Sequence, residues 1–359
     1  MKKFVVKVVI FSLVVLLIVF GINLWIDPGN LFHTKVIDEM AELLNEGRII
    51  ETPGNIDEGL FLEKMVSMMD EAPDTVIVGS SHVMYHDWDR LYDDYYDAAL
   101  SGAYMGDYFA AMGIFDNFDK MPKRVVFGVD PWAFESDITS GRHSSVRDYA
   151  GYMWDTVLEK ENDYNVGSQK TTFKKVKGLF EFTYFQNSLL YLKSMGIKYY
   201  LSGRNEEVRT ALDASEGERQ KIVPSGKRIM NTGSYEPKDK VYNDAQFAIE
   251  NDAMYELADG FSEPQYNNIS QFEALVMYLQ AENIEVVFFL HPWYPDVYDY
   301  FETAENYHAV LEIEDYLRNY ATERNITVIG SYDPDICGVT AEDFADWLHV
   351  SGDVTFDVP

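Results

Sequence analysis

Residues 75–82 read TVIVGSSH and decide the fold. All four residues at 75–78 are β-branched, which favours a buried strand, and Gly79, Ser80 and Ser81 then predict a tight turn at its end. Such a turn presents a serine hydroxyl and gathers backbone N–H groups in one concavity, where the negative charge of an acyl-transfer intermediate can be held. The same residues also fit a strand followed by a helix that a serine caps at its N-terminus.

Short runs of apolar residues, most of them β-branched, recur along the chain, and polar helical stretches separate several of them. We expect strands at residues 76–78, 98–100, 125–129, 286–290 and 326–329, and helices at residues 106–119, 269–283 and 311–325. Strands that alternate with helices predict an α/β fold with a parallel sheet, whose functional groups gather at the carboxyl ends of the strands. Polar or small residues follow these ends, among them Ser81, Gly102, Asp130 and His291.

A second polar pair, Asp346 and His349, lies near the C-terminus. A serine hydroxyl attacks a carbonyl only if an imidazole takes its proton and a carboxylate orients that imidazole. The spacing of three residues would place both side chains on one face of a helical turn. We therefore interpret Ser81, His349 and Asp346 as nucleophile, base and orienting acid, with Ser80 as the alternative nucleophile. The plainer alternative is that Asp346 caps a helix beside a half-buried loop histidine.

Composition narrows the class of function. The 359 residues are 47% hydrophobic and 15% aromatic, which is typical of a globular chain with an ample core. The formal net charge of −31 argues against a nucleic-acid partner, because phosphates would be repelled without a basic patch. Cys337 is the only cysteine, which excludes an intramolecular disulfide and a cysteine-based metal site. His86 has two aspartates nearby but no second cluster with ligand spacing, so we predict neither a metal nor a cofactor.

The N-terminus carries an apolar run at residues 4–26, preceded by Lys2 and Lys3. At about 1.5 Å per residue, roughly 20 residues of helix cross a hydrocarbon core of about 30 Å. A cleaved signal peptide is the competing interpretation, but the run is long for one and no small-residue cleavage site follows it. We therefore predict a single-pass anchor in the cell membrane, with the basic flank in the cytoplasm and the rest of the chain extracellular.

The chain divides into three expected parts. Residues 1–27 are the anchor, and residues 28–70, with helical periodicity at 36–45 and 60–69, are a juxtamembrane connector. Residues 71–359 form the main domain. Within it, residues 134–266 interrupt the alternation of strands and helices, so we predict a long insertion of helices and loops that suits a lid or an acceptor-binding surface.

The number and order of these motifs resemble the SGNH (GDSL-like) hydrolase and acyltransferase superfamily. Residues 79–81 look like the Gly-Asp-Ser block of that family, Gly102 matches the glycine of its second block, and Asp346 and His349 match its Asp-x-x-His block. Within the superfamily, the chain is most similar to the membrane-anchored DltD-like proteins that serve D-alanylation of teichoic acids. They share an N-terminal anchor, an Asp-Pro segment and a Gly-Ser-Ser block. The alginate-acetylation proteins are similar as well.

This resemblance implies a three-layer α/β/α sandwich with a flavodoxin-like parallel sheet. It also implies a Ser81, His349 and Asp346 triad, with the N–H groups of Ser81 and Gly102 binding the oxyanion. The implied activity is that of a serine esterase or O-acyltransferase, which moves an acyl or D-alanyl group to or from a cell-envelope polysaccharide or teichoic acid. A membrane-bound O-acyltransferase is the expected protein partner.

One residue departs from the family pattern. Asp130 stands where the third block of the family supplies an asparagine that donates to the oxyanion, and an ionised carboxylate donates no hydrogen bond. Asp130 would therefore act only when protonated, position substrate, or cap the strand end. His291 could line the pocket or simply pack among aromatic residues. Asp130 keeps open a second hypothesis, namely a catalytically inactive SGNH-like module that binds glycan and scaffolds a membrane-bound O-acyltransferase.

Overall fold

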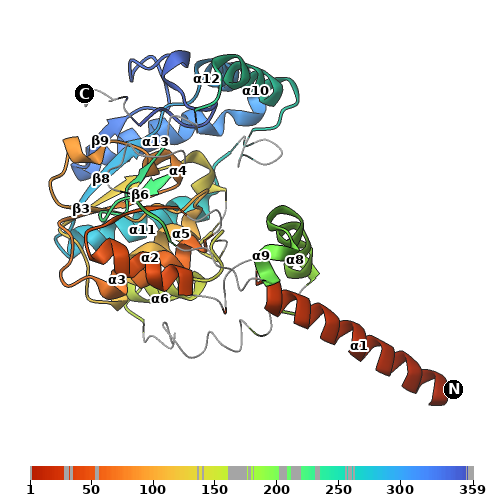
Figure 1. Cartoon of the computed structure of the whole chain (residues 1–359). Helices are drawn as coiled ribbons and strands as arrows, with labels where there is room; N and C mark the ends of the chain where they lie inside the picture. The colour runs from red at the N-terminus through yellow and green to blue at the C-terminus, as the bar shows by residue number, and fades with distance from the viewer. Residues whose placement is uncertain are drawn as a thin grey trace.

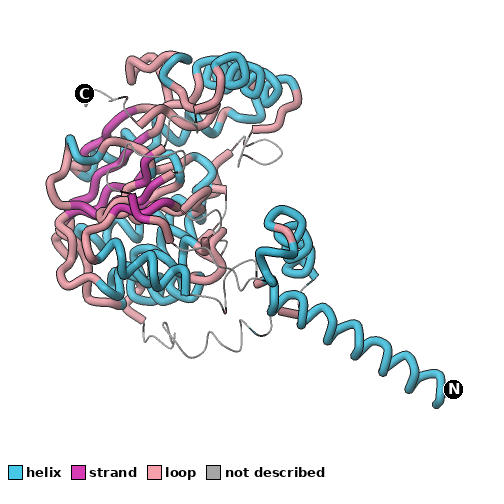
Figure 2. Tube along the Cα trace, viewed as in Figure 1, coloured by secondary structure: helices cyan, strands magenta, loops and turns pink. Residues whose placement is uncertain are grey.

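The computed structural model of the chain shows an α/β body and a long N-terminal helix that extends away from it (Figures 1 and 2). It describes residues 2–27, 32, 35–52, 56–135, 137–139, 141–160, 176, 179–180, 182–201, 208–211, 220–230, 235–254, 257, 261, 263–352 and 354.

The body is built on a five-stranded sheet in which neighbouring strands are parallel, in the order β3-β2-β4-β8-β9. The strands are β2 (Thr75–Val78), β3 (Tyr95–Asp97), β4 (Arg124–Gly128), β8 (Glu285–Leu290) and β9 (Thr327–Gly330). Ile77 of β2 pairs with Asp97 on one side and Val126 on the other. Its side chain and that of Phe288 are fully buried, as expected for a sheet in the core. The predicted α/β class and parallel sheet are confirmed.

The strand predicted at residues 98–100 is wrong, because β3 lies three residues earlier and ends at Asp97. The Oδ1 atom of Asp97 accepts the N–H of Ala99 at 3.0 Å, a local turn that takes the backbone out of strand geometry. The N–H of Leu100 still donates to the carbonyl of Gly79 at 2.9 Å. The apolar run is therefore a buried loop that continues along the end of β2, and Tyr95 and Tyr96 form the strand.

The predicted helices between the strands are present with small shifts of their ends. They are α5 (Met105–Asn117), α11 (Tyr266–Ala281) and α13 (Ala309–Arg324). Asn325 follows α13 in the left-handed conformation, with φ of +56°, and so turns the chain into β9. The other helices of this part are α4 (Ser81–Met84), α12 (Pro295–Thr303) and the 3₁₀ turns η1 (Trp88–Arg90), η2 (Pro131–Phe134), η4 (Glu305–Tyr307) and η5 (Ala341–Asp343).

The segment expected to be a juxtamembrane connector packs into the body. It forms α2 (Lys35–Asn45), β1 (Ile49–Glu51) and α3 (Glu58–Met68). Met40 and Val66 are fully buried in the same core as the sheet. Strand β1 lies in a second, antiparallel sheet of order β5-β1-β6-β7, whose other strands come from the predicted insertion: β5 (Thr210–Ala211), β6 (Lys221–Ile222) and β7 (Arg228–Ile229).

The insertion adds four described helices: α6 (Arg147–Val157), α8 (Phe182–Met195), α9 (Ile197–Leu201) and α10 (Lys238–Glu250). Helix α6 packs closely on α5 at Gly113, where any Cβ would collide with the Tyr149 carbonyl oxygen. Helices α8 and α9 lie at one end of α1, apart from the body (Figure 1).

Helix α1 (Lys2–Ile26) is long and apolar enough to span a membrane, a test that a signal sequence also passes. Its side chains are exposed through Ile18, and its last two turns are partly covered by the α8 region.

Candidate active site

The turn after β2 gives its two serines different environments. The side chain of Ser80 is fully buried, and its Oγ accepts the N–H of His82 at 3.1 Å, so Ser80 is the N-cap of α4. Gly79 is required because a Cβ there would lie 2.9 Å from both the Gly128 carbonyl oxygen and Val83. Ser81, the first residue of the helix, is left only partly buried.

Three side chains meet at Ser81. Its Oγ lies 2.8 Å from Nε2 of His349. The other ring nitrogen of His349, Nδ1, lies 2.9 and 3.0 Å from the two carboxylate oxygens of Asp346. A carboxylate oxygen accepts hydrogen bonds, so Nδ1 carries the proton and Nε2 is free to accept one from Ser81. The structure thus brings together the three residues that the sequence offered as a triad, and it places Ser81 rather than Ser80 against the imidazole.

The segment from Asp346 to His349 is an irregular turn, so the predicted helical turn is wrong. Asp346 Oδ1 accepts the N–H groups of Leu348 and His349, each at 2.8 Å, and this local bonding replaces the helix. A bridge between Phe344 and Val350 closes the turn. Burial raises the pKa of Asp346, but hydrogen bonds and charge from His349 outweigh it and leave this pKa below its ordinary value. Asp346 therefore stays ionised and holds the imidazole.

Two backbone N–H groups are available for an oxyanion. The hydrogen bond from the Leu100 N–H to the Gly79 carbonyl aligns the segments that follow β2 and β3. Ser81 lies two residues after Gly79, and Gly102 lies two residues after Leu100. Gly102 has φ of +58°, a conformation that favours glycine. Among the described residues, the N–H groups of Ser81 and Gly102 donate no hydrogen bond. The arrangement is compatible with the oxyanion role that the resemblance implies for them.

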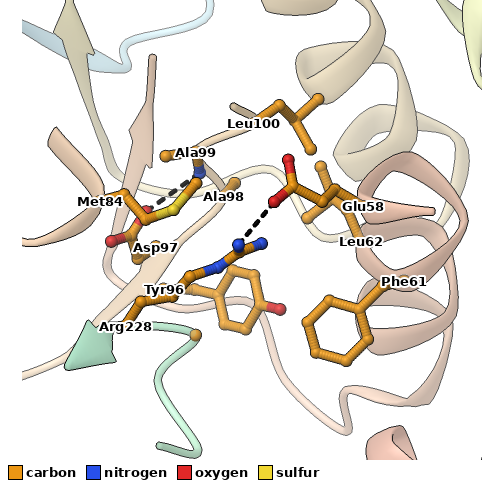
Figure 3. A pocket seen from close by; sticks show the side chains of 11 residues that line it. Glu58, Phe61, Leu62, Met84, Tyr96, Asp97, Ala98, Ala99, Leu100 and Arg228 are labelled. Carbon is orange, nitrogen blue, oxygen red and sulfur yellow. Dashed lines mark hydrogen bonds and ion pairs between the residues drawn. The ribbon is translucent and has the colours of Figure 1, made fainter. Parts of the chain in front are cut away.

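Glu58 and Arg228 were missed by the sequence reasoning and hold the loop before Gly102. Glu58 accepts the N–H of Ser101 at 2.7 Å with one oxygen, and with the other it accepts the Ser101 hydroxyl at 3.0 Å and the Arg228 guanidinium at 2.5 Å. Burial raises the pKa of Glu58, but Arg228 and the Ser101 N–H leave it below its ordinary value. Beside this pair lies a hollow of about 10 Å³, room for about one water molecule (Figure 3).

Asp97 lies in the same hollow with its carboxyl group buried (Figure 3). Its Oδ2 accepts no hydrogen bond from the described residues. Burial raises the pKa of Asp97 to about 8, against the opposing effects of the Ala99 N–H and Arg228. The carboxyl group is therefore largely protonated in the folded protein at neutral pH.

We expect Asp97→Asn to remove a pH dependence of stability. The folded pKa of Asp97 lies above its unfolded value, so its contribution to stability is complete at acidic pH and is lost as pH rises from about 4 to about 8, by at most about 1.4 kcal/mol per pH unit. Asp97→Asn should match the wild-type free energy of unfolding at pH 4 and exceed it at pH 9. Denaturant titrations at both pH values check this, with the exposed Asp93→Asn as control. Equal differences from wild type at both pH values would refute it.

Asp130, His82 and His291 form a buried cluster behind the triad. Oδ1 of Asp130 accepts from Nδ1 of His82 at 2.7 Å, and the His82 ring stacks on that of His291 with centroids 4.2 Å apart. The Nε2 of His291 accepts the N–H of Val350, next to His349, at 3.5 Å. Burial, then the neighbouring imidazoles, hold the pKa of His291 well below its ordinary value, so its ring stays neutral.

The cluster includes two residues that the sequence offers as candidates for binding substrate, Asp130 and His291. Asp130 and His291 are 2% and 5% exposed, so neither lies on an open surface where substrate could reach it directly. Within the described residues, no hydrogen bond joins Asp130 to Ser81. Both residues support the wall of the site in this structure, and a role in binding substrate stays a prediction.

The described residues contain no group of three or more histidine, cysteine, aspartate or glutamate side chains that could hold a metal ion. Comparisons with protein-family models, curated proteins and solved structures found no match to this chain. The function therefore has to be argued from the arrangement of Ser81, His349 and Asp346.

Proposed function

We propose that this protein is a serine esterase or O-acyltransferase that works through Ser81, His349 and Asp346. One observation carries the proposal: an unbroken series of hydrogen bonds runs from the Ser81 hydroxyl through the His349 ring to the Asp346 carboxylate. Residues 81 and 349 are 268 positions apart, and a folded chain brings a hydroxyl, an imidazole and a carboxylate into this order chiefly where a nucleophile is activated.

The geometry supports a two-step reaction. Ser81 Oγ attacks the carbonyl carbon of an acyl ester while His349 Nε2 takes its proton, and the oxyanion so formed accepts from the Ser81 and Gly102 N–H groups. The imidazolium returns the proton to the leaving oxygen, which departs as an alcohol and leaves an acyl ester on Ser81. A second hydroxyl then attacks that ester while His349 takes its proton, and the imidazolium returns the proton to Ser81 Oγ, which leaves as the free serine. Water as acceptor gives an esterase, and a sugar or polyol hydroxyl gives an acyltransferase.

The setting of the site suggests its substrate class. Helix α1 can anchor the chain in the cell membrane, and Lys2 and Lys3 at its N-terminal end favour an extracellular position for the body. An acyltransferase held there meets envelope glycopolymers, so the acceptor or donor is a polysaccharide or teichoic acid, as the SGNH and DltD-like resemblance implies. The same resemblance implies an α/β/α sandwich and a membrane-bound O-acyltransferase as donor-side partner.

The proposal is tested by measuring how much acyl group the protein releases from an ester and how much of it is transferred to an added acceptor instead of to water. The full chain in detergent should release p-nitrophenol from p-nitrophenyl acetate, and part of the acetyl group should appear on an added glycerol-phosphate polymer or oligosaccharide instead of water. Release with no transfer would indicate an esterase. Folded protein that releases nothing above the rate in buffer would contradict the proposal.

Asp130 favours a second candidate function. Its carboxylate is buried and held by His82, so no asparagine-like donor faces the site from this position. A module with a weakened oxyanion site would bind glycan and scaffold a membrane-bound O-acyltransferase without turnover. Glycan binding by a chain whose Ser81 never reacts would favour this candidate.

We expect Glu58→Gln to lower turnover more than substrate binding. Glutamine keeps one acceptor for Ser101 but loses the charge that Arg228 pairs with, so the loop that carries Gly102 is less firmly placed. Loss of one oxyanion donor costs about 10²–10³ in kcat, and a displaced donor should cost about tenfold or more, with a smaller change in KM. Kinetics with p-nitrophenyl acetate measure this split.

The matched control for that experiment is Glu63→Gln on the same helix, where the carboxylate accepts the Tyr149 hydroxyl at 3.0 Å. If Glu58→Gln and Glu63→Gln have equal kcat values, Glu58 is a structural residue only.

A further inference from the structure

Hydrogen bonds join the C-terminal end of α1 to the insertion. Asn23 is fully buried, donates to the Leu179 carbonyl at 2.8 Å and accepts the Ser188 hydroxyl at 2.9 Å. Asp27, which follows the helix, accepts the Tyr184 hydroxyl at 2.6 Å. Buried polar groups with specific partners are costly to separate, so α1 and α8 form one folded unit. If the helix were cleaved off as a signal sequence, the Ser188 hydroxyl would lose Asn23 as its partner.

The opposite face of α8 is apolar and exposed. Ser188 and Tyr184 are four residues apart and face α1, whereas Phe182, Leu189 and Leu190 recur at i, i+7 and i+8 on the other side. Phe182 is 70% exposed and Leu190 is 62% exposed. Ile197 and Leu201 of α9 are likewise exposed. Large apolar side chains left exposed on two contacting helices indicate a binding face.

The exposed apolar face of α8 begins next to α1, the candidate membrane-spanning helix. The Phe180 ring stacks on that of Phe20, with centroids 4.9 Å apart. Phe20 lies six residues before the end of α1 at Ile26, or about 9 Å along the helix axis at about 1.5 Å per residue. When α1 spans a bilayer, α8 therefore starts at the depth where interfacial helices bury their apolar side, about 5–10 Å into the headgroup boundary.

The charge of this segment is opposite to that of the chain. Helices α8 and α9, residues 182–201, carry two basic side chains, Lys193 and Lys198, and no acidic one, whereas the chain has a net charge of −31. Lys193 and Lys198 are exposed on the two helices. An apolar face flanked by lysines is typical of helices that lie on anionic lipid, where each basic residue near the surface contributes about 1 kcal/mol.

We propose that α8 and α9 lie on the membrane surface beside α1, with Phe182, Leu190 and Leu201 in the acyl boundary and the lysines at anionic lipid headgroups. The occupant of this face is the bilayer itself. This face adjoins α1 through the stacked Phe20 and Phe180 rings, and its lysines complement anionic lipid. The chain then has two contacts with the membrane, a spanning helix and a surface platform, which together fix the orientation of the body.

Nitroxide labels in the full chain test the proposal. Leu190→Cys or Leu201→Cys is labelled and the protein is placed in nanodiscs of phosphatidylcholine, with or without phosphatidylglycerol. Phe247→Cys on α10, 63% exposed in the wild type, is the matched control. Cys337 is buried, and burial raises its pKa to about 12, so it competes little for the label. Accessibility to oxygen reports lipid, and accessibility to a water-soluble nickel chelate reports solvent.

The labels at 190 and 201 should gain oxygen accessibility and lose nickel accessibility in nanodiscs, while the label at 247 stays open to nickel. In nanodiscs that contain phosphatidylglycerol, the label at 201 should lie deeper in the bilayer than in phosphatidylcholine alone. The double substitution Lys193→Glu and Lys198→Glu should abolish this difference in depth. Nickel accessibility equal to that at 247 would overturn the proposal. Shielding from both reagents would also overturn it, in favour of a protein that covers the face. Ser81 is unchanged in every variant, so this outcome is independent of the proposed catalysis.

Discussion

Ser81→Ala is expected to abolish acyl transfer, with kcat for p-nitrophenyl acetate reduced by about 10³-fold or more. The reason is geometric: Ser81 Oγ is the hydroxyl 2.8 Å from His349 Nε2, and the neighbouring Ser80 hydroxyl is occupied as a helix cap. Steady-state hydrolysis by the full chain measures the effect, and circular dichroism shows that the variant is folded.

Ser80→Ala is the matched control. It should keep its hydrolytic activity while losing about 0.5–2 kcal/mol of stability, as substitution of an N-cap serine does. The two serines are adjacent and chemically identical, so a loss confined to Ser81 isolates the position that His349 activates. Activity retained in Ser81→Ala but lost in Ser80→Ala would mean that the nucleophile has been assigned to the wrong residue.

Asp130→Ala is expected to give the largest loss of stability. Asp130 and His82 are both almost completely buried and hydrogen-bonded at 2.7 Å, and leaving a buried donor without its partner costs about 1–3 kcal/mol. Asp130→Asn keeps an acceptor for His82 Nδ1 and should lose much less. Chemical denaturation of the full chain measures both.

A double-mutant cycle separates the pair from its surroundings. Asp130→Ala and His82→Ala share one hydrogen bond, so the double variant should be clearly more stable than the sum of the two single losses predicts. If the losses simply add, or if Asp130→Ala costs under about 0.5 kcal/mol as a surface substitution does, the pair is not what holds the wall behind the triad.

The parallel sheet was predictable because β2, β4, β8 and β9 contain short runs rich in β-branched residues. Residues 75–78 match β2 without a shift. The prediction of a strand at 98–100 is wrong because apolar residues occur in buried loops as well as in buried strands. The turn at Asp97, which ends the strand geometry before this run, is not evident from the sequence. The sequence predicts a connector at residues 28–70 because helical periodicity shows that a helix has an apolar face but does not show what covers that face.

The triad was accessible from sequence because each member sits in a local motif. Ser81 follows a strand and a glycine, and Asp346 precedes His349 by three residues. The spacing predicts a helical turn, but it is equally compatible with the observed turn, in which the Asp346 carboxylate accepts the His349 N–H. Glu58 and Arg228 have no such motif. They are 170 residues apart and become partners only when β7 of the insertion folds next to α3, so no sequence pattern could reveal the support they give to Ser101.

The most direct test of an activated serine at position 81 is to locate the adduct that a fluorophosphonate forms with the full chain. Peptide mass spectrometry of labelled wild type should find the added mass on Ser81, and His349→Ala should abolish the labelling while leaving the protein folded. An adduct on Ser80 or elsewhere, or no adduct on folded protein, would contradict an activated serine at this site.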